Sequence, residues 1–346
     1  MPVVPSPTPH PSARPPVTVV LPTRDERAHI RDCLDTLLAQ DYPGPLEILV
    51  VDGGSTDGTP TIAGRVDARV RVIDNPRVTA AAAMNLGVAE ARTDLVVRAD
   101  AHALYAPDYV RMSIESLLEG DMAVVGGPMR PVGITPFGRA VAAITSSPLG
   151  VGPGRFHYAR ERAEVDTVYL GAFDKHTIIE AGGYDEHELQ WAAEDQELNL
   201  RIRAGGGRIV VDPAIKSWYF PRETPSALWR QYFNYGRCKA STLAKHGRLP
   251  HWRPLVPAAM VAGTAAVVVG AIVRRQPAIA VLPVAVYAAG AGAAAWHLAR
   301  DPGVAPHRAL GAIAICHWAH GLGFWAGIGR IALGRRFDTR PRGARI

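Results

Sequence analysis

Short apolar runs rich in β-branched residues alternate with helical patterns from about residue 17 onward. The strand-like runs are residues 17–21, 46–51, 70–73, 95–99, 121–127 and 207–212. The helical stretches between the first of them are residues 26–39, 57–66, 79–91 and 107–118. Continuous apolar strands separated by helices predict an α/β domain with a mostly parallel sheet of βαβ units. Such sheets bind ligands beyond the carboxyl ends of their strands.

Three long runs without Asp, Glu, Lys or Arg follow residue 250: residues 255–273, 277–298 and 309–328. At ~1.5 Å per residue, each run is long enough to cross ~30 Å of hydrocarbon. A helical core domain explains three successive runs poorly, so we expect membrane helices. Three spans would put the arginine-rich C-terminus opposite the α/β domain, against the positive-inside rule. The third run also contains two histidines and several glycines, so two spans and three spans both remain open.

The ends of the chain and its composition narrow the functional class. The first 16 residues hold seven prolines and no apolar segment, which predicts a disordered lead and not a signal peptide. The three cysteines are far apart in the sequence, which argues against a disulfide framework or a zinc site. The net charge is +6, and six arginines lie in the last 17 residues. A basic tail beside apolar segments favours a membrane surface over nucleic acid.

The chain is therefore expected to divide into four parts. These are a disordered proline-rich lead (1–16), an α/β catalytic domain (17–248), a membrane domain of two or three helices (249–330) and a basic tail (331–346).

Two strand–turn–helix segments carry polar residues at their turns. The segment VVLPTRDERAHI (19–30) turns at Pro22 and Thr23, and LVVDGGSTDGT (49–59) repeats the plan with Asp52 at the strand tip. The two glycines after Asp52 would let the backbone approach a ligand closely. Asp52 is either a ligand-binding residue or a turn aspartate that satisfies local amides. The glycine pair is not a GxGxxG motif, so a dinucleotide-binding dehydrogenase is weakly supported.

Asp100 and His102 follow the strand-like run at 95–99. In an extended strand, side chains two residues apart point the same way, so both groups could face one point beyond the sheet. Carboxylate and imidazole are both ligands for a divalent cation that bridges phosphates, and the imidazole shifts the preference from Mg²⁺ toward Mn²⁺. The alternative is that Asp100 merely caps a loop.

Glu194 and Asp195 begin an amphipathic helix within QWAAEDQELNLRIRAGG (190–206). Acids at a helix N-terminus are favoured by the helix dipole, which is a sufficient structural reason for them. A carboxylate held there and open to a cleft would also suit a general base. Residues 171–186 predict a strand, a helix and a loop under the cleft. Residues 228–240 gather aromatic and basic side chains, as in a helix at a membrane interface.

Taken together, these segments resemble family 2 glycosyltransferases, which are inverting enzymes with the GT-A fold. The resemblance rests on the order LPTRDE, VVDGGSTDGT, RADAH, GAF…GGYDE, the Glu-Asp helix and RQYFNYGR over residues 17 to about 240. Within the family, RADAHALY, SSPLGVG and EDQELNLRIRAGG are similar to bacterial succinoglycan-biosynthesis glucosyltransferases. The implied architecture is a Rossmann-like GT-A domain followed by C-terminal transmembrane helices.

The resemblance also implies a role for each matched residue. Asp195 would be the catalytic base, and Asp100 with His102 would hold the divalent cation, Mn²⁺ or Mg²⁺. The residues matched to the nucleotide pocket are Pro22, Thr23, Arg24, Glu26 and Asp52. The residues matched to acceptor or diphosphate contacts are Gly171, Ala172, Phe173, Glu194, Arg230, Gln231 and Arg237.

Five positions depart from the family pattern. Asp25 replaces an asparagine, Gly53 replaces the second aspartate of a pair, and His102 stands where a second metal-binding acid is usual. The family's Gln-x-x-Arg-Trp appears as Gln231-x-x-Asn234-Tyr235. A clamp on the diphosphate would therefore use Arg230 or Arg237, and single addition is favoured over processive polymer synthesis.

The resemblance implies a membrane-bound enzyme that moves a sugar, glucose by the nearest similarity, from a UDP-sugar to a polyprenyl-diphosphate-linked saccharide. It would act in extracellular or cell-wall polysaccharide synthesis, as a multi-pass plasma-membrane protein whose catalytic domain is cytoplasmic and that binds membrane lipid but no nucleic acid. A polyprenyl-phosphate sugar synthase shares the fold and needs no general base. A nonenzymatic nucleotide-binding membrane scaffold is the alternative from another class, and the intact set of acids argues against it.

Overall fold

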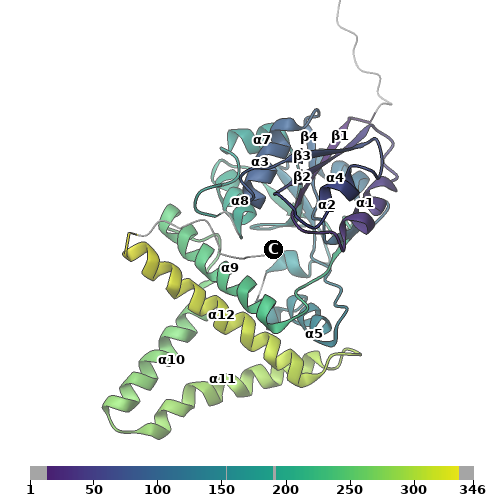
Figure 1. The fold of residues 1–346 in the computed structure, drawn as a ribbon. Coiled ribbons are helices and arrows are strands. Elements are labelled where there is room, and N and C mark those ends of the chain that lie inside the picture. Colours follow the sequence, from purple (N-terminus) through teal and green to yellow (C-terminus); the bar gives the residue numbers. More distant parts are fainter. Residues whose placement is uncertain (1–13, 153, 190–191, 335–346) are drawn as a thin grey trace, which may run out of the picture.

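The computed structural model describes residues 14–152, 154–189 and 192–334. It consists of an α/β domain and a group of long helices that lies along one side of it (Figure 1). Most of the predicted proline-rich lead and of the predicted basic tail, residues 1–13 and 335–346, lies outside the described residues.

An eight-stranded sheet forms the centre of the α/β domain, in the order β3-β2-β1-β4-β8-β6-β9-β7. Its strands are β1 (Val17–Thr23), β2 (Leu46–Asp52), β3 (Val70–Asp74), β4 (Leu95–Arg98), β6 (Val124–Gly127), β7 (Ala163–Glu164), β8 (Tyr169–Asp174) and β9 (Ile209–Val211). The first four strands pair in parallel, with Thr23 opposite Asp52 where β1 and β2 end. The predicted mostly parallel sheet is therefore confirmed.

One strand at the middle of the sheet runs against both of its neighbours. β8 lies between β4 and β6 and is antiparallel to both. The apolar pattern of a buried strand is the same in either direction, so the sequence predicted a strand here but not its orientation. Because β8 is reversed, its first residues, Tyr169 and Leu170, reach the edge at which β4 ends.

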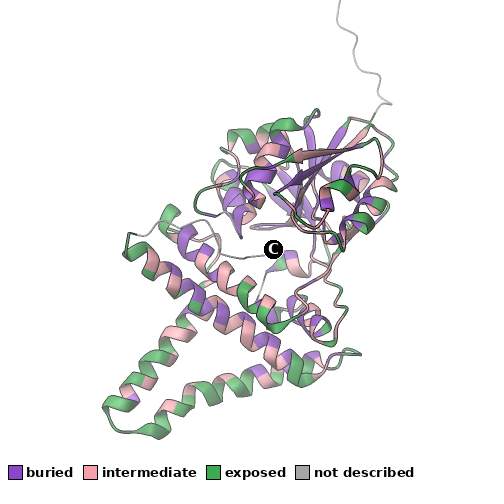
Figure 2. Cartoon of the chain, in the orientation of Figure 1, coloured by how far each residue is buried: buried purple, intermediate pink, exposed green. Residues whose placement is uncertain are grey.

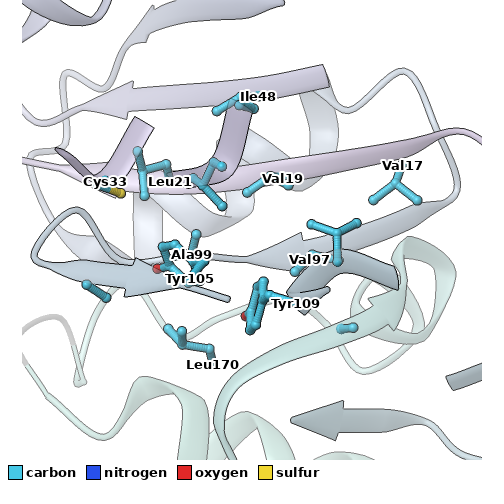
Figure 3. Packing of buried hydrophobic residues seen from close by; sticks show 14 of the residues in the cluster. Val17, Val19, Leu21, Cys33, Ile48, Val97, Ala99, Tyr105, Tyr109 and Leu170 are labelled. Atoms are coloured by element: carbon cyan, nitrogen blue, oxygen red, sulfur yellow. The ribbon is translucent and has the colours of Figure 1, made fainter. Parts of the chain in front are cut away.

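Helices cover both faces of the sheet and enclose two separate cores. On one face lie α1 (Ile30–Leu38), α2 (Thr59–Ala63) and α4 (Tyr109–Leu118), and on the other α3 (Ala80–Glu90), α7 (Lys175–Glu180) and α8 (Glu194–Ala204). β1 serves both cores, since Val19 and Leu21 belong to the first and Val20 to the second. Figure 3 shows the first core, with Val19 and Leu21 near Tyr105 and Tyr109.

A two-stranded antiparallel sheet stands beside the main one. It pairs β5 (Ala103–Tyr105) with β10 (Ser217–Tyr219), so that Ser217 lies opposite Tyr105. To enter this pairing the chain turns sharply after β4, and residues 100–102 lie in that turn. After β10 a short loop leads into the long helix α9 (Pro225–His246).

The helical part is built around α9 and α12 (Pro306–Ala332), which pack against each other along much of their length (Figure 1). Two glycines allow this close approach. A Cβ at Gly236 of α9 would overlap the carbonyl oxygen of His320, and a Cβ at Gly323 of α12 would overlap that of Phe233. The short helices α5 (Pro136–Thr145) and α6 (Pro148–Val151) lie beside α12, and η1 (Arg155–His157) follows them in the chain.

The remaining helices are α10 (Leu255–Val273) and α11 (Pro277–Leu298). They follow α9 and precede α12 in the chain, and together they form an apolar hairpin. Among the described residues they are the two helices long and apolar enough to cross a membrane, and only 11% of each such stretch is buried. Figure 2 shows them as mostly exposed. The third uncharged run belongs to α12, whose Ala309, Ile313 and Cys316 share a core with α5 and α9. The structure thus favours two candidate spans over three.

Candidate active site

A cavity of about 1060 Å³ lies between the carboxyl edge of the sheet and the long helices. The ends of β1 and β4 and the start of α8 form one wall, and α9, α12 and the start of α10 form the other. Residues from 141–152 and residues 156–157 also contribute to the lining. The cavity is therefore where the fold predicts a ligand, beyond the carboxyl ends of parallel strands.

The loops that follow β1 and β2 are tied together at the edge of this cavity. Asp25 has a φ of 52°, a left-handed conformation that aspartate and asparagine tolerate better than most residues. Its carboxylate accepts a hydrogen bond from the Thr56 backbone N–H at 2.8 Å, and its own N–H donates to the Ser55 hydroxyl at 2.8 Å. Aspartate thus meets the backbone requirement at the position where the family pattern has asparagine.

Asp52 behaves as the turn interpretation predicts. Its Oδ2 accepts the backbone N–H groups of Gly54 and Ser55 at 3.0 and 2.8 Å, and its Oδ1 accepts the Ser55 hydroxyl at 2.5 Å. The side chain is buried in its own turn and is not part of the cavity lining. A contact of Asp52 with a nucleotide base stays a prediction.

Asp100 and His102 lie in a turn, so the argument from strand spacing was wrong in its geometry. β4 ends at Arg98, and residues 99–102 lead directly into β5. The Tyr105 hydroxyl closes the turn, because it accepts the Asp100 N–H at 2.7 Å and donates to the Asp100 carbonyl at 3.0 Å. Both side chains nevertheless line the cavity, so the turn brings them to the expected place.

His102 is held by Glu26 from the loop after β1. Its Nδ1 lies 3.1 Å from Oε1 of Glu26. Burial by itself would lower the pKa of His102, but the hydrogen bond and the charge of Glu26, aided by Asp100, raise it above its ordinary value. The charge of Arg222 opposes this increase, so Arg222 also lies close to this corner of the cavity.

Arg98 links the corner at Asp100 to the acids of α8. Its guanidinium lies 3.3 Å from Asp100 Oδ1 and 3.2 Å from Glu194 Oε1, and its side chain is 13% exposed. Burial would lower the pKa of Arg98, but the two carboxylates raise it well above its ordinary value. Burial also raises the pKa of Glu194 to about 6, against the opposing charge of Arg98. The three side chains form one buried charge network beside the cavity.

Asp195 is held at the first turn of α8 and lines the cavity. Its Oδ1 accepts the Gln196 backbone N–H at 2.7 Å. The Gln196 side chain in turn accepts a hydrogen bond from the ammonium of Lys239 on α9. Burial lowers the pKa of Lys239, and the charge of Asp195 partly opposes this. A buried lysine is thus hydrogen-bonded to the residue that follows Asp195, the acid that could act as a base.

One face of α9 runs along the cavity. Gln231, Tyr235 and Lys239 are spaced four residues apart, which places them on the same side of the helix, and all three line the cavity. Gln231 donates a hydrogen bond to the Tyr235 hydroxyl at 3.1 Å. The segment predicted as an interfacial helix therefore contributes directly to the site.

The structure brings together most of the residues that the sequence singled out. Those that line the cavity are Pro22, Thr23, Arg24, Glu26, Asp100, His102, Glu194, Asp195, Arg230, Gln231 and Arg237. Gly171, Ala172 and Phe173 do not, because they lie in the middle of β8, where Phe173 is 1% exposed in the second core. Acceptor or diphosphate contacts at these three positions are thus not supported by their location. It is the start of β8, at Tyr169 and Leu170, that reaches the cavity.

Several cations of the site were not expected from the sequence, among them Arg98, Lys239 and Arg222. Arg98 could have been found, because a charged residue inside an apolar strand run requires a partner. Lys239 could have been found from its helical spacing to Gln231. Arg222 lies in the loop after β10 without a pattern of its own, so no sequence signal indicated it.

The donor set fits a divalent cation shared with a substrate better than a cation held by the protein alone. Among the described residues, no group of three or more His, Cys, Asp or Glu side chains is arranged to hold a metal ion. Asp100 and His102 supply one oxygen and one nitrogen at the same cavity corner. Cations that serve nucleotides are commonly bound by one or two side chains and completed by phosphate oxygens and water.

Comparison with known proteins agrees with the fold. Residues 18–168 match the family described as glycosyl transferase family 2. The chain is 34% identical over 321 residues to the succinoglycan biosynthesis protein ExoA of Rhizobium meliloti (strain 1021), covering 89% of this chain and 93% of that protein. The chain belongs to glycosyltransferase family 2.

The enzyme also resembles more distant glycosyltransferases. It is 28% identical over 240 residues to a dolichyl N-acetyl-α-D-glucosaminyl phosphate 3-β-D-2,3-diacetamido-2,3-dideoxy-β-D-glucuronosyltransferase of Methanococcus voltae, covering 66% of this chain and 74% of that protein. A mannosyltransferase of Pyrobaculum calidifontis, in complex with GDP-mannose and Mn²⁺, superimposes with a TM-score of 0.61 at 23% identity, covering 90% and 89% of the two chains. The expected GT-A fold is thereby confirmed.

Proposed function

We propose that this family 2 glycosyltransferase moves glucose from UDP-glucose to a hydroxyl group of a polyprenyl-diphosphate-linked saccharide during polysaccharide synthesis. The observation that carries the proposal is the line of charged residues from Asp100 through Arg98 to Glu194, with Asp195 beside it in the same cavity. One end suits a sugar-nucleotide diphosphate and the other suits a base. The similarity to a succinoglycan biosynthesis protein and to a transferase named for a dolichyl-linked substrate supports the acceptor class.

The donor would bind where the loops after β1 and β2 meet the sheet edge. Pro22, Thr23, Arg24 and Glu26 line this end of the cavity. Asp100 and His102 would hold a divalent cation, which supplies positive charge to the diphosphate as it leaves. Glu26 keeps the imidazole of His102 turned toward itself through the hydrogen bond at Nδ1. The similarity in fold to the Pyrobaculum calidifontis structure, which contains a nucleotide sugar and Mn²⁺, supports the use of a divalent cation with the donor.

The reaction itself would be a single displacement. Asp195 accepts the proton of the acceptor hydroxyl as the oxygen attacks the anomeric carbon, and the bond to the diphosphate breaks on the opposite side. An α-linked sugar nucleotide therefore gives a β-glycoside. Glu194 would not compete as the base, because its carboxylate is engaged by Arg98. The cations of the cavity stabilise the negative charge that develops on the leaving diphosphate.

The membrane would be crossed by α10 and α11. They span 19 and 22 residues, or about 28 and 33 Å, which matches the hydrocarbon thickness. Only 11% of each apolar stretch is buried, unlike the core helix of a soluble protein, which supports their placement in a membrane. With α12 packed against α9, two spans return the chain to the side of the catalytic domain, where the positive-inside rule favours the cytoplasm.

The test is transfer by membranes that contain the enzyme, assayed with a panel of radiolabelled UDP-sugars and lipid acceptors. UDP-glucose should label the lipid fraction, and a β-glucosidase should release the label. Asp195→Asn should lower turnover by ~10²–10⁴-fold and leave UDP affinity unchanged. Turnover that survives this substitution would indicate a phosphate acceptor and a polyprenyl-phosphate sugar synthase. Absence of transfer from every UDP-sugar would overturn the choice of donor.

A further inference from the structure

The two walls of the cavity carry different charges. All five carboxylates in the described lining belong to the wall formed by the sheet and α8, which also contains Arg24 and Arg98; they are Glu26, Asp100, Glu188, Glu194 and Asp195. The described lining from residue 222 onward contains cations and no Asp or Glu; its cations are Arg222, Arg230, Arg237, Lys239, Arg253 and Arg330. The helical wall is thus suited to an anion of its own.

Lys239 lies at the centre of the helical wall. It is 7% exposed and donates to the neutral amide of Gln196. Within the described parts of the chain, no carboxylate lies within ion-pair distance of its ammonium. A buried ammonium without a directly bonded counter-charge is unfavourable, so a bound anion would stabilise it.

Three further nitrogen-bearing side chains line the cavity together with Lys239, namely His157, Arg253 and His320. The charge of Arg253 acts on Lys239 and on His157, and the charge of Lys239 acts on His320. Arg253 is already paired with Asp166 at 2.5 Å. The Nδ1 atoms of His157 and His320 are buried and have no hydrogen-bond partner among the described residues. Buried polar atoms are rarely left without a partner, so these nitrogens indicate a polar ligand.

The same wall leads to the membrane hairpin. Trp252, Val256, Pro257 and Met260 line the cavity next to Arg253, and they continue into α10. Beyond them α10 is apolar and exposed, with Val269 and other side chains open to the surroundings (Figure 2). A molecule with an anionic head at Lys239 could therefore lay an apolar tail along α10.

We propose that Lys239, with Arg253 and His320, binds the phosphate groups of the membrane-lipid acceptor at a site separate from that of the donor diphosphate. The inference rests on the proposed function and names the part of the acceptor that the helical wall recognises. The donor diphosphate belongs to the corner at Asp100 and His102, beside Arg222. The charges that act on Lys239 include those of Asp195, Asp166 and Arg253, whereas those that act most on His102 are Glu26, Asp100 and Arg222. The two groups of residues share no member, which places the two phosphate sites at different points of the cavity.

The experiment measures binding without turnover, with the full chain in detergent micelles. Farnesyl diphosphate is titrated calorimetrically while UDP and Mn²⁺ saturate the donor site, and farnesol and inorganic pyrophosphate are titrated in parallel. We expect farnesyl diphosphate to bind in the presence of UDP and Lys239→Met to weaken it at least tenfold. Lys239→Arg should weaken it less than threefold, and UDP affinity should stay unchanged in both. Lys245→Met is the matched control, because Lys245 is on the same helix and pairs with Asp185 and Glu197 outside the cavity.

Each other outcome would overturn the proposal. Displacement of farnesyl diphosphate by UDP would assign the helical cations to the donor. Farnesol bound as tightly as farnesyl diphosphate would show that only the tail is recognised, and pyrophosphate bound as tightly would exclude a lipid-specific site. If Lys239→Met does not fold, Gln196→Glu supplies the test, since a carboxylate there would neutralise Lys239 and should weaken binding similarly. Transfer of radiolabelled glucose from UDP-glucose to a lipid acceptor, assayed on the same preparations, tests the proposed function separately.

Discussion

Replacing Arg98 by methionine should destabilise the enzyme more at pH 8 than at pH 5. Methionine keeps much of the length of the side chain and removes the charge that Asp100 and Glu194 share. Removing one partner of a buried ion pair typically costs about 3–5 kcal/mol, because the remaining charge stays buried and uncompensated. We expect a loss of that size at pH 8.

The pH dependence follows from Glu194. Its pKa in the folded enzyme is already raised from 4.5 to about 6, so its charged form is disfavoured by folding. The resulting cost is fully present above the folded pKa and disappears as pH falls below the unfolded value. Without Arg98 the folded pKa rises further, so the cost at pH 8 increases. At pH 5 Glu194 is protonated, and the loss should shrink to about 1–2 kcal/mol, from the remaining charge of Asp100.

Thermal unfolding of the full-length protein in detergent at pH 5 and pH 8 measures this difference. At about 2–4 °C per kcal/mol, the midpoint should fall by about 6–20 °C at pH 8 and by only a few degrees at pH 5. Arg31→Met is the control, because Arg31 pairs with Asp35 on an exposed helix face and should cost less than about 1 kcal/mol at either pH. An equal loss for Arg98→Met at both pH values would refute the buried network as the cause.

Three further predictions concern the metal, the packing of α8 and the membrane. His102→Asp should shift activation from Mn²⁺ toward Mg²⁺ because an all-oxygen site suits the harder ion; metal titrations identical to wild type would remove the imidazole from the site. Glu197→Gln should lower the free energy of unfolding by about 3–5 kcal/mol at pH 7, since this fully buried carboxylate accepts from three basic side chains. Its pKa is lowered by these partners against the opposing effect of burial, so the wild-type advantage should disappear as pH falls through that lowered pKa; denaturant unfolding that is insensitive to the substitution would contradict this. Gln276→Cys, at the tip of the hairpin, should react with an impermeant maleimide added outside intact cells, whereas Arg248→Cys should react only in permeabilised cells. The three native cysteines are buried and should give little background labelling. The reverse labelling pattern would show that the topology is inverted.

The parallel half of the sheet was predictable because the apolar pattern of each strand in the sequence matches its burial on both faces in the fold. Strands buried on both faces need continuous apolar runs, and residues 17–21 and 46–51 have them. The orientation of β8 was not predictable, because it depends on which neighbours the strand joins and not on its own side chains. The same reason explains why Gly171 to Phe173 were expected in the site and lie in the core.

The residues of the candidate site were predictable where a charged side chain lies at the end of a helix or strand. Asp195 and Asp100 carry charge at element ends, which sequence alone can flag. Arg98 and Lys239 could have been flagged from the sequence, but their partners could not, because these lie on another element at 194 and 196 in the chain. The role of α12 was missed for a related reason. Its composition fits a membrane span, and only its packing against α9 shows that it serves as part of the cavity wall.

The packing of α12 against α9 also sets an order of events during synthesis. α12 is made after the apolar hairpin, yet its His317 and His320 complete the wall that faces α8. A nascent chain that ends near residue 250 has its sheet and its acids but lacks this wall, and the α9 surface around Gly236 is bare. The ribosome must therefore release the hairpin before the cavity can close. The nascent enzyme therefore gains the helical wall of its cavity only after the apolar hairpin of α10 and α11 has emerged.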